Sequence, residues 1–294
     1  MGLFSFLKNR KKAKPASPES GQLTEEYRRA VFLDACSNPS PLRSDLDYPR
    51  FLVQECAISS PSSYQKDLQA EGFFEPCDLA GMLRAMNIVD LHRILTDASL
   101  APAPDRDGCI ALILSSAADQ AKLLHPETWY RLSEKSRLYL QSHQDLLQLH
   151  RHRNDWMISP QEYEKEKDPA LSFMENIEGI LTSRMQNAAD GMPLGSAAGR
   201  EQHLYGLYLL YEENGRRDKA LNCLLEILQL CLGSEISPEI ISALIDHQDL
   251  YDPSLLLPLP ESPVCGKEQL DRILQGIFDQ TIDEDSIPEL LSQD

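Results

Sequence analysis

The chain has 294 residues, of which 42% are hydrophobic and 25% are charged, and its formal net charge is −18. This composition is ordinary for a soluble globular protein, and the chain is long enough for two compact domains that each bury a core. No apolar run approaches the roughly 18 residues that a membrane-spanning helix needs, so we predict no membrane span.

The seven cysteines are scattered along the chain and form no CxxC pair. An odd number without close spacing is typical of reduced, buried thiols, not of a disulfide framework. The basic start of the chain has too few apolar residues for a secretory signal. We therefore predict a cytoplasmic protein.

The acidic excess is confined to the second half of the chain. Residues 1–153 contain 19 basic and 19 acidic residues, whereas residues 154–294 contain 9 and 27. Excess negative charge repels nucleic acid and suits a basic protein partner. The asymmetry predicts a first domain over residues 23–166, a second over residues 167–282 and an acidic tail over residues 283–294.

Residues 1–22 combine five Lys and Arg residues with Pro, Ser and Gly. This composition predicts a disordered basic leader. The alternative is a short amphipathic anchor, in which the apolar residues at positions 3–7 contact an anionic membrane surface.

Several short helices are expected before residue 76. Thr24 is placed to cap a helix over residues 24–36, and the SNPSP run at 37–41 breaks the chain. A short helix follows over Phe51 to Cys56. Ser60 and Pro61 then begin another, which ends near Gly72.

Residues 78–118 have a helix–extension–helix pattern. Apolar residues at helical spacing run from Met82 to Leu95 and predict a first helix. Alternating prolines in APAP at 101–104 favour an extended backbone. Asp105 or Asp107 can cap a second helix, which carries the apolar residues of 109–114.

This pattern resembles the SAP motif, a helix–extension–helix module associated with DNA and chromatin, and its flanks look like bacterial SAP-domain-containing proteins. The apolar skeleton of the motif corresponds to Ile88, Leu91, Ile94, Leu95, Leu100, Ile110 and Ile113. The sequence departs from the motif at Ser99 and Pro104, where glycines are usual, and at Leu112, where an arginine is usual. The resemblance implies a DNA-associated role, and Arg106 keeps the basic position.

A basic segment follows the module. Three basic and six acidic residues lie in 78–119, whereas 121–153 has a net charge of +3 with Trp129, Tyr130 and Tyr139 interleaved. We predict a basic helix there that binds phosphates and stacks bases. The predicted nucleic-acid-binding residues are Arg106, Arg131, Lys135, Arg137, Arg151 and Arg153. The alternative is an amphipathic helix that packs on the module while its basic face contacts only solvent.

No catalytic or metal-binding motif is present. The HRHR run at 150–153 places its histidines on different sides of a helix, and no HExxH or paired CxxC occurs. GxSxG, GxxxxGK[ST] and GxGxxG are also absent. We predict no metal, no cofactor and no enzymatic activity.

The second half has helical periodicity throughout. A linker over 162–169 is expected to lead into a helix over 170–186. Residues 200–233 predict a helical hairpin turning at Asn214–Gly215, either a single tetratricopeptide-like unit or an ordinary helix pair. Further helices are expected from Pro238 and over 270–280. Strand signals are nearly absent, so the predicted fold class is all-α, with a SAP-like N-terminal domain and an acidic helical bundle.

Three functional classes compete, and an enzyme is the least favoured of them. The favoured one is a non-catalytic SAP-like protein associated with DNA or another nucleic acid through the basic helix beside the module. The alternative is a protein–protein interaction scaffold that uses the acidic helical second half.

Overall fold

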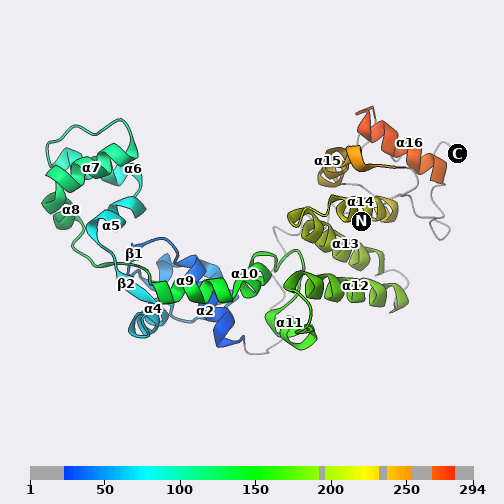
Figure 1. Cartoon of the computed structure of the whole chain (residues 1–294), viewed down its shortest axis with the longest axis horizontal. Coiled ribbons are helices and arrows are strands. Elements are labelled where there is room, and N and C mark those ends of the chain that lie inside the picture. The colour runs from blue at the N-terminus through cyan, green and yellow to red at the C-terminus, as the bar shows by residue number, and fades with distance from the viewer. Residues whose placement is uncertain (1–22, 192–195, 232–236, 253–266, 282–294) are drawn as a thin grey trace. The chain divides into compact units, whose positions relative to one another are not determined.

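The computed structural model describes residues 23–191, 196–231, 237–252 and 267–281. Helices make up most of this part, and its strands form one small three-stranded sheet (Figure 1), which confirms the mainly α-helical fold class. The predicted leader at 1–22 and acidic tail at 283–294 lie outside the described residues.

The chain forms two compact units that divide between Arg151 and His152. The N-terminal unit covers residues 21–151, and the C-terminal unit contains the described residues from 152 onward. The sequence-based boundary lies at residue 166 instead. Trp156 and Tyr163, which precede it, are buried against Phe173 of the C-terminal unit, at ring-centroid distances of 6.0 and 5.4 Å.

The N-terminal unit consists of short helices and three short strands. In chain order these are α2 (Glu25–Ala35), β1 (Ser40–Pro41), a 3-10 turn (Asp45–Asp47), α3 (Arg50–Gln54), α4 (Pro61–Ala70), β2 (Phe74–Pro76), α5 (Leu79–Ala85), α6 (Ile88–Asp97), α7 (Arg106–Ser116), α8 (Ala118–Leu124), β3 (Trp129–Leu132), α9 (Glu134–Ser142) and α10 (Gln144–Arg151).

Polar side chains fix the starts of several of these helices, as the sequence predicts. Thr24 Oγ1 accepts from the amide of Tyr27 at 3.2 Å, and Ser60 Oγ accepts from that of Ser63 at 3.4 Å. Asp105, one of two candidates, caps α7. Each cap satisfies a main-chain amide that has no partner inside its helix.

The sequence did not reveal this small sheet, whose few residues leave the fold mainly α-helical. β3 is the central strand, and it pairs antiparallel with β1 and with β2. Tyr130 lies opposite Ser40 on one side and Pro76 on the other. Strands of two to four residues are too short for an alternating pattern to stand out in the sequence.

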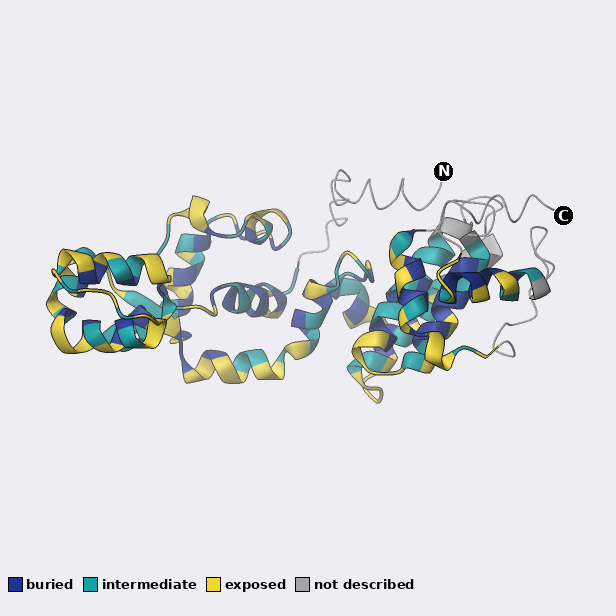
Figure 2. Cartoon of the chain, turned by 90° about the horizontal axis from the view of Figure 1, so that it is seen from above, coloured by how far each residue is buried: buried dark blue, intermediate teal, exposed yellow. Residues whose placement is uncertain are grey.

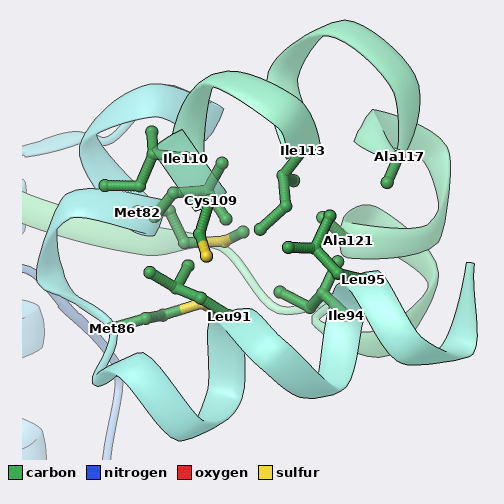
Figure 3. Close-up of a cluster of buried hydrophobic side chains, with 11 residues drawn as sticks. Met82, Met86, Leu91, Ile94, Leu95, Cys109, Ile110, Ile113, Ala117 and Ala121 are labelled. Carbon is green, nitrogen blue, oxygen red and sulfur yellow. The ribbon is translucent and has the colours of Figure 1, made fainter. Parts of the chain in front are cut away.

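The module lies between β2 and β3 in the chain and has its own core (Figure 3). The core is formed by side chains of α5 to α8, namely Met82, Leu83, Met86, Leu91, Ile94, Leu95, Cys109, Ile110, Ile113, Ala117 and Ala121. α6 and α7 are two helices joined by a segment over 98–105 that has neither helix nor strand. The first predicted helix is in fact two, because Asn87 caps a new helix at the amide of Asp90 (2.9 Å).

The C-terminal unit is a series of helices that pack mainly on their neighbours in the chain. They are α11 (Pro160–Glu166), α12 (Phe173–Gly191), α13 (Ser196–Glu213), α14 (Arg217–Cys231), α15 (Pro238–Asp246), a 3-10 turn (Gln248–Leu250) and α16 (Lys267–Phe278). The predicted hairpin turn at Asn214–Gly215 is confirmed, with Gly215 at a φ of +66°. Buried and exposed residues alternate along these helices (Figure 2).

The prediction of a linker over 162–169 is wrong for most of that stretch, because α11 extends to Glu166. Ser159 caps α11 by accepting from the amide of Glu162 at 3.1 Å, and Pro160 occupies the first turn. Tyr163 is 3% exposed, so the helix has a buried face despite its high charge. A proline at the first helical position favours a helix start.

Candidate nucleic-acid interface

Arg131 and Lys135, two of the predicted residues, each bond to the stretch of chain that runs from the end of α4 through β2. Arg131 lies on β3, and its Nε donates to Glu75 Oε1 at 2.8 Å. Lys135 lies in the first turn of α9. Its Nζ donates to the main-chain oxygen of Glu71 at 2.7 Å and lies 4.2 Å from the ring centre of Phe73. Both cations therefore lie along the connection from α4 into β2.

Hydroxyl groups fix the start of α9 on that connection. Ser133 Oγ donates to the main-chain oxygen of Gly72 at 2.8 Å and accepts from the amide of Ser136 at 3.3 Å. The Ser136 hydroxyl donates to the main-chain oxygen of Phe73. Because Ser133 and Ser136 are buried, these bonds hold the helix that carries Lys135 in a defined position.

Arg137 and Arg151 each have a carboxylate partner at the surface. Arg137 Nε is 3.0 Å from Glu134 Oε2 on the same helix, and Arg151 Nη2 is 3.5 Å from Asp34 Oδ1 on α2. The arginine side chains are 55% and 50% exposed. Exposed ion pairs of this kind contribute about 0–1 kcal/mol, so an incoming phosphate can replace the carboxylate.

Arg106 and Arg153 do not join this group. Arg106 Nη2 donates to the main-chain oxygen of Arg84 at 2.7 Å and to that of Met86, so it ties the end of α5 to the start of α7. Arg153 follows α10 and belongs to the C-terminal unit. Of the six predicted residues, Arg131, Lys135 and Arg137 lie on β3 and α9, which follow one another in the chain, whereas Arg151 lies on α10. We refer to these three as the β3–α9 cations.

The prediction of one basic helix over 131–153 is wrong. Arg131 lies in a strand, α9 ends at Ser142 and α10 begins at Gln144. The break falls at His143, whose Nδ1 is 2.8 Å from the main-chain oxygen of Tyr139. The cations are therefore spread over three elements and do not form one helical stripe.

Two of the three aromatic rings in this segment, those of Tyr139 and Trp129, pack within the fold. Tyr139 stacks on His143 with ring centroids 4.0 Å apart, and its hydroxyl donates to the main-chain oxygen of Glu26 at 3.3 Å. Burial is the main cause that raises the pKa of Tyr139 to about 12. Trp129 is partly buried against the module core, and its Nε1 donates to Glu127 at 3.2 Å. These two rings are poorly placed to stack on bases.

Sequence reasoning missed the carboxylates that accompany the cations. Glu75 is 56 positions from Arg131, and Asp34 is 117 positions from Arg151. A charge count over 121–153 therefore overstates the positive charge that a ligand meets. No local signal in the sequence reveals such distant pairs.

Within the described residues, no group of three or more His, Cys, Asp or Glu side chains is arranged to hold a metal ion. His150 is buried, with its Nδ1 2.9 Å from the hydroxyl of Tyr27. Among the described helices, none combines the length and apolar character of a membrane span.

Replacing Arg106 by glutamine is expected to lower the free energy of unfolding by about 1–2 kcal/mol, because two main-chain oxygens lose a charged donor. Urea denaturation of the full chain followed by circular dichroism measures the change. Arg93→Gln is the control, since that side chain is 73% exposed. Equal stability of the two variants would contradict the structural role and make Arg106 a ligand-binding candidate again.

Comparison with family models, with curated proteins and with solved structures gave no match for this chain.

Proposed function

We propose that this protein is a non-catalytic, nucleic-acid-associated protein that binds phosphates through the β3–α9 cations beside a SAP-like module. The module resembles the motif in its helix–extension–helix order and in its apolar skeleton. Its own charge is acidic, so the neighbouring cations supply the contacts to phosphate.

One observation carries this proposal: Trp129, the first residue of β3, packs against the module core. The main-chain oxygen of Trp129 also accepts from the amide of Cys77 at 2.8 Å, just before α5 begins. The module thereby holds the strand that bears Arg131. A cation held on a rigid element loses less conformational entropy when it binds a phosphate than one on a free chain.

Binding of the full chain to a labelled DNA duplex, measured by fluorescence anisotropy, tests the proposal. Three phosphate contacts predict a slope of log K against log salt of about −2.7 and a dissociation constant of roughly 10⁻⁴–10⁻⁶ M. In the Arg131→Gln/Lys135→Gln/Arg137→Gln variant we expect at least tenfold weaker binding at low salt and a slope near zero.

The matched control is Arg50→Gln/Lys66→Gln/Arg93→Gln, which removes three exposed cations from the same unit. This control should bind DNA like the wild type, because the proposal places the phosphate contacts at the β3–α9 cations and does not attribute binding to the net charge of the unit. Equal losses in the two variants, or no wild-type binding at low salt, would refute the proposal.

The cysteines support a cytoplasmic location for this activity. Cys36, Cys77, Cys109 and Cys223 form no disulfide, and Cys36, Cys56, Cys109 and Cys223 are buried. Burial is the main cause that raises the pKa of Cys36 and of Cys223 to about 12, so these thiols are unreactive. A reducing compartment suits such a set.

A second candidate function, a protein-interaction scaffold, is favoured by the C-terminal unit. Its helices α12, α13 and α14 pack in chain order, each mainly on the next. Sequential stacking of this kind leaves helix faces available to a partner, as in helical repeat proteins. The excess of acidic residues in this half makes nucleic acid a poor partner for it.

A further inference from the structure

An open groove of about 530 Å³ lies in the C-terminal unit. It is lined by one face of α12 and by residues at the start of α14, namely Glu175, Glu178, Gly179, Thr182, Ser183, Gln186, Arg216 and Lys219. None of these side chains is apolar. An amphipathic helix therefore finds no apolar side chain there to pack on, whereas a peptide main chain finds hydroxyl and amide groups to bond.

Glu178 already has its partners within the fold. Its Oε1 accepts from Lys219 Nζ and from the Tyr211 hydroxyl, both at 2.8 Å, and its Oε2 lies 3.2 Å from Arg216 Nη1. Lys219 also lies 5.0 Å from the ring centre of Tyr211. These contacts fix the charged end of the groove and leave Glu178 little capacity for a ligand.

Arg216 has donors to spare among the described residues, and it offers a planar guanidinium where Lys219 offers an ammonium group. A guanidinium has five N–H groups, and the Arg216 side chain uses one of them, on Glu178. The side chain is 46% exposed. The remaining donors match a carboxylate, which a guanidinium can bind through two parallel hydrogen bonds. The carboxylates of Glu175 and Glu178 at the same end disfavour a more highly charged group such as phosphate.

The length of the groove sets the size of its occupant. From Glu175 to Gln186 the face of α12 spans about 16 Å at 1.5 Å per residue. An extended peptide covers that distance with about five residues. Gly179 lies within this span, and a Cβ built on it meets nothing within 4 Å, so the groove is open at that point.

We propose that this groove binds an extended segment of a partner protein, about five residues long, with a carboxylate that pairs with Arg216. The proposal rests on the protein-interaction function and names the chemistry of its partner. The uncharged polar residues Thr182, Ser183 and Gln186 bond the main chain of that segment.

The experiment selects peptides that bind the full-length protein from a displayed library of random heptapeptides. Enriched peptides, fluorescently labelled, are then titrated with the wild type and with Gly179→Leu, which fills the groove with a good helix former. We expect an Asp or Glu at one fixed position among the enriched peptides, and at least tenfold weaker binding to Gly179→Leu. In Arg216→Gln the preference for the acidic residue should disappear.

The control is Gly199→Leu, since Gly199 is also a helical glycine with nothing within 4 Å of a built Cβ and does not line the groove. It should bind like the wild type. The proposal that the groove binds a peptide would be overturned by a selection without enrichment, or by enriched peptides that bind Gly179→Leu as tightly as the wild type. A partner of the full chain that still binds Gly179→Leu would also overturn it, while supporting the broader scaffold function.

Discussion

Replacing Trp156 by alanine is expected to lower the free energy of unfolding of the C-terminal unit by about 3–5 kcal/mol. The side chain is 2% exposed and stacks on His152 with ring centroids 4.3 Å apart. Its Cδ1 would lie 3.5 Å from a Cβ on Gly206, so the helix backbone approaches it closely. Arg184 Nη1 donates to the Trp156 main-chain oxygen at 3.2 Å and restricts collapse around the cavity.

The two tryptophans make this measurement selective. One lies in each unit, so in Trp156→Ala the fluorescence reports Trp129 alone, while circular dichroism follows both units. In urea we expect an earlier transition by circular dichroism and an unchanged Trp129 transition. The surface control is Leu171→Ala, a residue that is 47% exposed. A Trp156→Ala protein as stable as this control would contradict the packing role.

Trp156→Phe separates packing from hydrogen bonding. Trp156 Nε1 is buried and has no hydrogen-bond partner among the described residues, which costs free energy in the folded state. Phenylalanine removes that group and keeps most of the apolar contact. We therefore expect a loss well below that of Trp156→Ala. Similar losses in the two variants would show that the indole nitrogen has a partner after all.

Replacing Glu178 by glutamine is expected to cost about 1.5–3 kcal/mol at neutral pH, because Lys219 and Arg216 lose a charged acceptor. Urea denaturation monitored by circular dichroism measures this cost. Glu166→Gln, which changes an exposed residue of the same unit, is the control. A Glu178→Gln variant as stable as Glu166→Gln would contradict a role of Glu178 in joining α12, α13 and α14.

The effect of Glu178→Gln also depends on pH. Burial acts to raise the pKa of Glu178, but hydrogen bonds from Lys219 and Tyr211 and the nearby positive charges outweigh it and hold the pKa below 4.5. A carboxyl whose pKa is lower in the folded state stabilises the fold fully above its ordinary pKa and loses that contribution as pH falls. The wild type should therefore lose its advantage over Glu178→Gln below pH 4.5. A constant difference down to pH 3 would contradict this account.

Local signals predict where most of the helices begin. The caps at Thr24, Ser60 and Asp105 can be predicted from the sequence, because a capping side chain bonds an amide within three residues of it. The break between α5 and α6 cannot be predicted in this way. Met86 is 3% exposed and continues the apolar stripe across the break, so the spacing looks like that of one helix.

The candidate site was predictable in its residue types but not in its arrangement. Arg131 belongs to a strand because the pairing of β3 with β2 is formed with residues more than fifty positions away. The same separation hides Glu75 from a local charge count. Tertiary pairing of this kind overrides local propensity, and one sequence contains no measure of it.

The hydrogen bond between the Cys77 amide and the Trp129 oxygen joins the two ends of the module. Once folded, the module holds the end of β2 and the start of β3 together as a tight turn would, although residues 77–128 separate them in the chain. Closing so long a loop costs conformational entropy, and the folding of the module around its own core offsets that cost. Any loss of order among α5 to α8 therefore also weakens strand pairing at Arg131, without a change to the strand.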